Sequence, residues 1–265
     1  MGKQGVHPRF PEAIAVVTGA SSGIGLAFAR QLASVGFNVV AVSTDKADGP
    51  ALLSTLDGAR HRHVTADLST NAGLNRVADI LTKSSTLEVL VNAAGRGVSE
   101  LFVSDRLDDE LLMLDLNVRV PLVLTHAAIH SMRRAGTGTI FTVASTAGFW
   151  SGGTYSASKA WVLAFSDGVA RSLKGSGVQM TCVAPGFTNT NFFDHAKVPV
   201  RTRRASWLWL TPKLVVHESL QAAGRGYSLC IPTRRYRFLV RLARSLPHGA
   251  RHRLVAVLSR AAGLE

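Results

Sequence analysis

Cysteine and long apolar stretches are both scarce in this chain, and each scarcity argues against a class of protein. The two cysteines, Cys182 and Cys230, lie in apolar runs, which predicts reduced thiols in a core rather than a disulfide framework. No stretch of about 18 uncharged apolar residues is present, because residues 13–29 are broken by Thr18, Gly19 and other small polar residues. No apolar segment follows the first basic residues as it would in a signal peptide. We therefore expect a soluble, cytoplasmic protein.

Acidic residues are scarce as well, and the shortage is concentrated near the C-terminus. The chain has 30 Lys and Arg against 17 Asp and Glu, a net charge of +13. Of these, 14 basic and 2 acidic residues lie between residues 197 and 265, whereas residues 1–196 are nearly balanced. Any partner that is attracted by positive charge is therefore expected at the last quarter of the chain.

What the first 185 residues do contain is an alternation of short apolar runs and helical periodicity. The apolar runs, which we interpret as strands, occur at residues 14–17, 38–42, 63–65, 87–91, 139–144 and 178–184. The helical segments occur at residues 24–35, 70–81, 108–134 and 154–173. Strands that are apolar throughout are typical of a parallel sheet covered on both faces. The alternation predicts a Rossmann-type, doubly wound α/β fold.

A further strand is expected at residues 227–231, which gives a sheet of about seven strands. We assign residues 1–232 to one catalytic domain, with a cofactor half at residues 11–135 and a catalytic and substrate half at residues 136–232. Residues 233–265 form a basic, amphipathic, helical C-terminal extension.

In that extension, apolar and basic residues are expected on different sides of a helix that is interrupted at residues 247–249. The apolar side would carry Phe238, Leu239, Leu242 and Leu246, and the basic side Arg234, Arg237, Arg241 and Arg244. Residues 197–265 allow three interpretations. They form a solvated surface without a dedicated partner, or they contact anionic lipid at the inner membrane face or an acidic acyl carrier. Nucleic acid is the least favoured partner, since no nucleic-acid motif accompanies the charge.

Three glycines, Gly19, Gly23 and Gly25, separate the first strand from the first helix. Their spacing is not the G-x-G-x-x-G of the ordinary dinucleotide fingerprint. The physical requirement is the same, because small residues let the backbone approach a pyrophosphate at a helix N-terminus. This turn, with Ser21, Ser22 and Ile24, is therefore a predicted nucleotide site.

Tyr155 and Lys159 are four residues apart in a predicted helix, which places the phenol and the ammonium on one face. The lysine charge is expected to pull the tyrosine pKa below its ordinary value of about 10 and so to create an acid/base for neutral pH. Alone, this spacing is also typical of a solvated helix face. The glycine turn upstream and Ser145, ten residues before Tyr155, favour the catalytic interpretation.

Together these motifs resemble the short-chain dehydrogenase/reductase family over residues 13 to about 190, and the extension more weakly resembles that of actinobacterial members. The resemblance implies cofactor contacts by the glycine turn, by an aspartate at the adenine, by a motif after the fourth strand and by a segment beside the nicotinamide. After the glycines, the matching residues are Asp67 with Leu68; Asn92, Ala93, Ala94 and Gly95; and Pro185, Gly186, Thr188 and Thr190. The catalytic residues that match are Asn117, Ser145, Tyr155 and Lys159.

The implied reaction is hydride transfer between a nicotinamide and a carbonyl or secondary alcohol, with the redox chemistry supplied by the cofactor. Tyr155 would be the acid/base, and Lys159 would stabilise its phenolate and hold the nicotinamide ribose. Ser145 would position the substrate oxygen, and Asn117 would bind a water that links Lys159 to solvent. No metal is expected. Family members commonly form dimers or tetramers through the helices that correspond to residues 108–134 and 154–173.

The end of the second strand bears on the choice of cofactor. In the family an aspartate there accepts the ribose hydroxyls of NAD, but this chain has Ser43, Thr44 and Asp45 instead, with Ser43 at the position of the acid. Phosphate is not repelled at that point, although no arginine follows and Ser22 replaces a basic residue that many NADP enzymes carry. NADP(H) is therefore favoured over NAD(H).

The loop between Ser145 and Tyr155 is a few residues shorter than is usual in the family, and Gly148 identifies Ser145 within it. Aromatic residues cluster around the site segments, either as ordinary packing or as an apolar substrate pocket. The predicted pocket residues are Gly148, Phe149, Trp150, Phe187 and Phe192. These features favour an oxidoreductase for a lipid-like ketone, a 3-oxoacyl compound or a steroid. The alternative is a catalytically silent NAD(P) sensor that acts through its basic tail; the intact catalytic residues argue against it.

Overall fold

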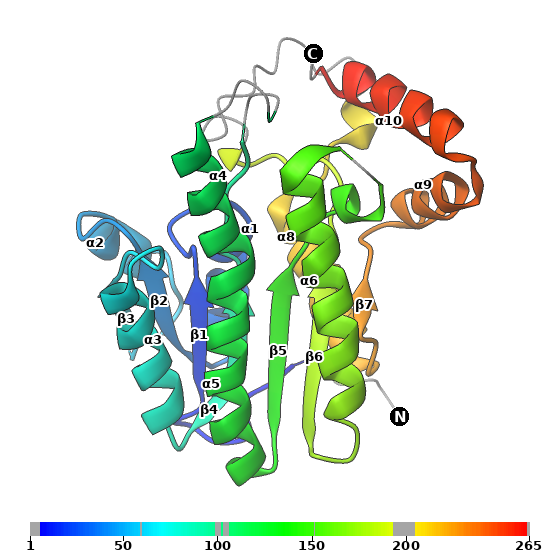
Figure 1. Cartoon of the computed structure of the whole chain (residues 1–265). Coiled ribbons are helices and arrows are strands. Elements are labelled where there is room, and N and C mark those ends of the chain that lie inside the picture. Colours follow the sequence, from blue (N-terminus) through cyan, green and yellow to red (C-terminus); the bar gives the residue numbers. More distant parts are fainter. Residues whose placement is uncertain are drawn as a thin grey trace.

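The computed structural model describes residues 6–58, 60–98, 102, 106–150, 152–192 and 205–263. Residues 197–204 and 264–265 of the basic segment lie outside these ranges. In the described part, seven parallel strands form one sheet in the order β3-β2-β1-β4-β5-β6-β7 (Figure 1). The strands are β1 (Ile14–Thr18), β2 (Asn38–Ser43), β3 (Arg62–Thr65), β4 (Leu87–Asn92), β5 (Gly138–Val143), β6 (Val178–Val183) and β7 (Leu229–Cys230). The predicted Rossmann-type sheet is confirmed.

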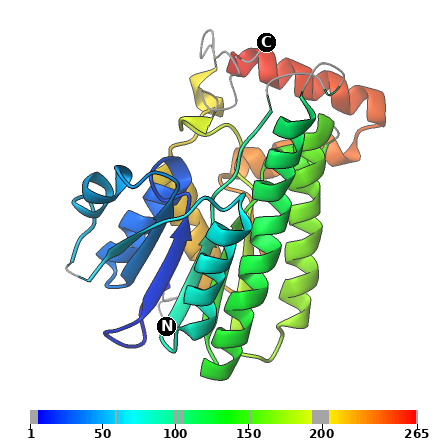
Figure 2. The ribbon, with the colours of Figure 1, turned by 60° about the vertical axis from the view of Figure 1, so that its left-hand side comes forward.

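Helices cover both faces of the sheet (Figure 1; Figure 2). On one face α1 (Gly23–Ser34) packs beside α8 (Pro212–Gly224), and on the other α3 (Asn71–Lys83) packs beside α5 (Val120–Ala135), with α6 (Gly153–Ser172) over β6. Each face has its own core. Phe28 of α1 meets Phe141 of β5 with ring centroids 5.1 Å apart, and Leu124 and Met132 of α5 are fully buried on the opposite face. Burial of each such side chain contributes about 1.5–3 kcal/mol, so both layers hold the sheet.

Local sequence explains where several helices begin and end. The side chain of Thr70 accepts a hydrogen bond from the backbone N–H of Gly73 at the start of α3, and Thr211 caps α8 in the same way before Pro212. Helix α5 ends at Gly136, whose φ of 67° lies in the left-handed region. The predicted elements agree with the structure to within one or two residues at most ends. Helix α8 and the short α2 (Asp48–Leu53) were not predicted.

The helix predicted for residues 108–134 is continuous in space but contains a wider turn. Helix α4 (Leu107–Leu114) leads into a π-helical turn, η1 (Asp115–Arg119), and then into α5. By length and composition Leu107–Ala135 is the one helix in the described ranges that could span a membrane. Its packing against α3 and β4 is that of a core helix. Single π-turns are frequently functional, and this one contains Asn117.

The C-terminal extension forms two helices, α9 (Arg234–Ser245) and α10 (His248–Ala262), which lie at the carboxyl end of the sheet (Figure 1; Figure 2). The side of α9 that was predicted to be apolar is not the buried side. Phe238 is 64% exposed and Leu242 37% exposed, whereas Tyr236, Val240 and Ala243 are buried. The buried residues follow the spacing i, i+4 and i+7, which is also an apolar helical stripe.

Candidate active site

Glycines form a tight cradle where β1 ends and α1 begins. Gly19 has a φ of 64°, and a Cβ there would lie 2.9 Å from the Cα of Ala94. A Cβ on Gly25 would lie 2.1 Å from the carbonyl oxygen of Gly19. Neither position accepts a larger residue without backbone movement. The cradle leaves the N-terminus of α1, with its free N–H groups, facing the carboxyl edge of the sheet.

Thr18 fastens this turn to the end of β4. Its buried hydroxyl donates a hydrogen bond to the carbonyl of Val91 at 3.2 Å and accepts from the backbone N–H groups of Ala93 and Ala94, each at 3.1 Å. The neighbouring Asn92 points elsewhere: its amide donates to Thr125 and Thr142 in the interior. Sequence reasoning assigned Asn92 to the cofactor, but its side chain joins β4 to α5 and β5.

Asn117 in the π-turn holds the loop after β4. Its Oδ1 accepts from the backbone N–H of Arg96 at 3.1 Å, and its Nδ2 donates to the carbonyl of Arg96 at 2.9 Å and to the hydroxyl of Ser158 at 3.1 Å. The side chain is 2% exposed and fully engaged. Asn117 thus positions the segment beside Gly95, and the predicted water link to Lys159 stays a prediction.

Lys159 of α6 is buried, and its side chain reaches the end of β5. Its Nζ donates to the carbonyl of Val143 at 3.1 Å and lies 5.7 Å from the centroid of the Tyr155 ring. Burial lowers the pKa of Lys159 to about 8, partly opposed by the nearby Cys182. The ammonium is therefore still the main form at neutral pH, but with little margin.

The expected low pKa of Tyr155 is not found. Burial raises the pKa of Tyr155 to about 12, and the hydrogen bond with Ser145 opposes this only in part. Lys159 is close to the ring but is not among the groups that lower the tyrosine pKa. The phenol is consequently protonated at neutral pH, which suits it to donate a proton.

These side chains open onto one cavity of about 480 Å³ that runs from the glycine turn to Tyr155 and on to α10. The predicted site residues that line it are Gly19, Ser22, Gly23, Ile24, Gly25, Ala93, Ala94, Gly95, Ser145, Trp150, Tyr155, Lys159, Pro185, Gly186, Phe187, Thr188, Thr190 and Phe192. The ring of Phe192 lies 5.6 Å from that of Tyr155. The cavity thus joins a nucleotide-sized cradle to an acid/base with aromatic walls.

Other predicted residues lie outside this cavity. They are Ser21, Ser43, Thr44, Asp67, Leu68, Asn92, Asn117, Gly148 and Phe149. Gly148 packs against the backbone of α6, where a Cβ would lie 2.7 Å from the carbonyl carbon of Lys159, and Phe149 joins a small core cluster. Ser43 is buried, and its hydroxyl is shared between His63 Nε2 at 2.8 Å and the carbonyl of Asp45 at 3.2 Å. That hydroxyl therefore already has partners within the protein.

Sequence reasoning missed the wall that the extension contributes. Tyr236 and Leu239 of α9 and Val255, Leu258 and Ser259 of α10 line the cavity. The buried Tyr236 hydroxyl donates to the carbonyl of Leu208 at 2.7 Å and accepts from the backbone N–H of Phe187 at 3.0 Å. Its ring lies so close to Gly186 that a Cβ there would be 1.9 Å from it. The periodicity of Tyr236 with Leu239, Val240 and Ala243 was the available signal.

A glycine cradle on a doubly wound sheet, joined to a Ser–Tyr–Lys group at its carboxyl edge, defines a dinucleotide-dependent oxidoreductase. Residues 13–198 match the family model of the short chain dehydrogenases. The chain is 34% identical over 189 residues to a 3-oxoacyl-[acyl-carrier-protein] reductase of Synechocystis, a match that covers 69% of this chain and 76% of the relative.

Solved structures of dehydrogenases are also similar to this chain. A short-chain dehydrogenase from Sphingobium yanoikuyae in complex with NADPH has a TM-score of 0.79 at 28% identity, covering 92% of this chain and 95% of the other. A bulky-bulky ketone specific alcohol dehydrogenase from Comamonas testosteroni has a TM-score of 0.76 at 27% identity, covering 89% and 93%. The chain belongs to the short-chain dehydrogenase/reductase family and is an NAD(P)-dependent oxidoreductase.

Proposed function

We propose that the protein reduces an apolar ketone, with Tyr155 as the proton donor. The observation that carries this proposal is the protonated Tyr155 hydroxyl, hydrogen-bonded to Ser145, in a cavity whose far wall is apolar. A group that donates a proton at neutral pH needs a pKa above that pH, and about 12 satisfies this condition.

The residues divide the work as follows. The bound nicotinamide supplies the hydride. Ser145 and Tyr155 hold the carbonyl oxygen of the substrate, and Tyr155 gives it a proton. Lys159 does not lower the tyrosine pKa in this structure, so we assign its ammonium to the cofactor: its Nζ lies near Gly95, where the ribose of the cofactor would lie. The cradle of Gly19, Gly23 and Gly25 fits a pyrophosphate, because these glycines line the cavity at the N-terminus of α1, where N–H groups and the helix dipole favour an anion.

The walls of the cavity support a hydrophobic substrate. The lining of the cavity includes the apolar and aromatic side chains of Trp150, Phe192, Leu208, Leu239, Val255 and Leu258. Such a surface binds aliphatic or ring carbon and offers few partners to a polar molecule. The similarity to a 3-oxoacyl reductase and to a dehydrogenase for bulky ketones supports a lipid-like ketone, a 3-oxoacyl compound or a steroid as substrate.

For the cofactor we propose NADP(H). Ser43 stands at the end of β2 and is followed by the exposed Thr44, Asp45 and Lys46. The carboxylate of Asp45 accepts a hydrogen bond from the backbone N–H of Ala47 at 2.8 Å. The hydroxyl of Ser43 is engaged with His63, so Thr44 and Lys46 are the side chains left to meet a 2′-phosphate. The NADPH complex of the similar Sphingobium enzyme agrees with this choice.

We further propose a homodimer, or a tetramer built from it, through the long helices α4–α5 and α6. A line of leucines on α4 and α5 is exposed: Leu107 by 67%, Leu111 by 51%, Leu114 by 40% and Leu122 by 44%. Consecutive leucines are four, three and eight residues apart, which places them on nearly one side of the continuous helix. An apolar stripe of this kind is best stabilised by a second copy.

Replacing Tyr155 with Phe tests the reaction. Turnover of NADPH with a panel of lipophilic ketones should fall by at least about a thousandfold, because the proton donor is lost. Binding of NADPH, measured by fluorescence titration, should persist. Undiminished turnover in the variant would refute Tyr155 as donor. Tight cofactor binding without turnover of any ketone by the parent protein would favour the nucleotide sensor instead.

A further inference from the structure

Helices α9 and α10 carry the same surface pattern. In α9 the exposed Phe238 follows Arg234 by four residues and precedes Arg241 by three. In α10 Val257, which is 59% exposed, stands in the same relation to Arg253 and Arg260. Residues at these spacings share one side of a helix. Each helix therefore presents an apolar side chain between two arginines.

We define the outer face of α9–α10 as these exposed positions together with two neighbours in α9. Its residues are Arg234, Phe238, Arg241, Leu242 and Arg244 of α9 and Arg253, Val257 and Arg260 of α10. The opposite sides of both helices line the same cavity, through Leu239 and Leu258 among others. Because the two inner sides converge on the cavity, the two outer sides point away from the body of the protein.

The charge of this face is not neutralised within the described part of the chain. Neither helix contains Asp or Glu. Arg237, beside the outer face, is paired with Glu218 of α8, whereas Arg234, Arg241 and Arg244 make no ion pair in the described ranges. Nearby, Trp207 is 53% exposed, and the chain just before it is hydrogen-bonded to the end of α10 through Ala205 and Ala261.

We propose that the outer face of α9–α10 docks on an anionic lipid surface. The arginines would meet the headgroups, and Phe238 and Leu242 would enter the boundary with the acyl chains. An acidic protein would meet the same arginines, and the vesicle experiment below distinguishes the two partners. Exposed apolar side chains between arginines are what an interfacial helix needs. The proposal concerns binding only and holds whatever the substrate is.

Vesicle flotation of the full chain tests the proposal. We expect binding to phosphatidylcholine vesicles that contain phosphatidylglycerol, little binding to pure phosphatidylcholine, and a loss of binding as salt rises. The triple change Arg234→Gln, Arg241→Gln and Arg244→Gln should weaken binding on the order of a hundredfold, from about 1 kcal/mol for each arginine. Phe238→Ser with Leu242→Ser should weaken it about tenfold or more at unchanged charge.

A matched control removes the same charge from the opposite end of the molecule. Arg133, Lys174 and Arg225 are exposed near the ends of α5, α6 and α8, and their triple change to Gln should cost less than about fivefold. The thermal midpoint of each variant checks its folding. Three results would overturn the proposal: no binding of the parent to anionic vesicles at low salt, an equal loss in the control, or full binding by the Phe238/Leu242 variant. Arginine-dependent binding to an acidic acyl carrier protein, without vesicle binding, would identify a protein partner instead.

Discussion

At the scale of single residues, burial is the main influence on both groups of the catalytic pair. It raises the pKa of Tyr155 to about 12 and lowers that of Lys159 to about 8, so each group is pushed toward its neutral form. Only the pKa of Lys159 is shifted toward neutral pH; that of Tyr155 moves further away from it. The ammonium that the proposed reaction uses is therefore kept at the expense of stability.

Replacing Lys159 with Met should make the protein more stable at neutral pH although inactive. The lysine pKa is about 8 in the folded chain against 10.5 ordinarily, so the unfolded chain binds more protons between these values. The lysine therefore lowers the free energy of unfolding by its full amount below pH 8, and this destabilisation decreases as pH rises toward 10.5. We expect a gain of about 3 kcal/mol at pH 7 and about 1 kcal/mol at pH 10.

Urea unfolding at both pH values measures this difference. Lys83, which is 75% exposed, provides the control: Lys83→Met should change the free energy of unfolding by less than about 0.5 kcal/mol. A Lys159→Met variant that is less stable than the parent at pH 7 would mean that the Val143 hydrogen bond outweighs desolvation.

Tyr236 is expected to act as a positioning residue. Tyr236→Phe removes the hydroxyl that joins α9 to Phe187 and Leu208, and leaves a part-buried N–H and a buried carbonyl with one partner fewer. Stability should fall by about 1–3 kcal/mol. The KM for an apolar ketone should rise about threefold or more while kcat stays within about twofold, since Tyr236 shapes the cavity but holds no reacting atom.

Steady-state kinetics and thermal unfolding check both effects. The matched variant Tyr227→Phe changes a tyrosine that is 57% exposed and should leave KM and stability unchanged. If Tyr236→Phe lowers stability but not the apparent affinity for ketone, Tyr236 is structural only.

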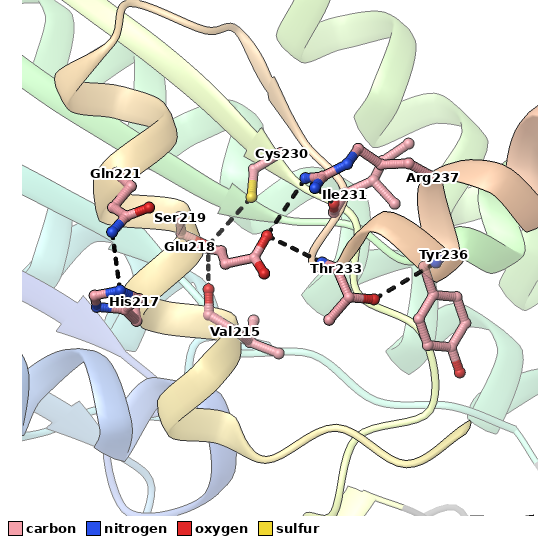
Figure 3. A network of polar contacts seen from close by, with 10 residues as sticks. All are labelled: Val215, His217, Glu218, Ser219, Gln221, Cys230, Ile231, Thr233, Tyr236 and Arg237. Atoms are coloured by element: carbon pink, nitrogen blue, oxygen red, sulfur yellow. Dashed lines mark hydrogen bonds and ion pairs between the residues drawn. The ribbon is translucent and has the colours of Figure 1, made fainter. Parts of the chain in front are cut away.

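At the scale of elements, α9 is held in place by Glu218 of α8 (Figure 3). Its carboxylate accepts from the backbone N–H of Thr233 at 3.0 Å and pairs with Arg237 at 3.4 Å. Thr233 is the single non-glycine residue with positive φ in the described ranges, at 70°, and a β-branched residue is strained there. The chain enters α9 through this strained residue, so the Glu218 contacts fix the direction of the helix.

Glu218→Ala should loosen α9 from the cavity. We expect a loss of about 1–3 kcal/mol in the free energy of unfolding and faster proteolysis around residue 233. The control Asp79→Ala breaks an exposed ion pair with Lys83 in α3 and should cost less than about 0.5 kcal/mol. Equal effects of the two changes in denaturant titration would contradict an anchoring role for Glu218.

Elements were predictable from the sequence to different degrees. The strands and most helices follow from apolar periodicity, and the glycine turn follows from its position after the first strand. The π-turn at Asn117 was not predictable, because an added residue per turn leaves no mark in the apolar pattern. The face of α9 was ambiguous, since Phe238 with Leu242 and Tyr236 with Val240 and Ala243 both make helical stripes. The stripe that contains Tyr236 is the buried one, because the Tyr236 ring packs against Gly186.

At the scale of the whole molecule, three surfaces lie on different elements. The cavity opens at the carboxyl edge of the sheet, where α9 and α10 also lie (Figure 2). The outer face of α9–α10 is on those two helices, and the exposed leucines are on α4 and α5. The outer face of α9–α10 is rich in arginine, whereas the leucine stripe of α4 and α5 is apolar. We therefore expect separate partners, a lipid surface for the first and a second copy of the chain for the other.

Leu111→Glu should dissociate the proposed dimer without unfolding the protomer. Leu111 is 51% exposed, so a carboxylate is tolerated in the single chain but would be buried among leucines in a dimer, where an unpaired charge is costly. Light scattering coupled to size-exclusion chromatography should show the parent as a dimer or tetramer and the variant as a monomer. Phe10→Glu, at a residue that is 57% exposed and not part of the leucine stripe, should leave the assembly intact. A parent that is monomeric at all concentrations, or a variant that assembles as the parent does, would assign the leucine stripe to another partner.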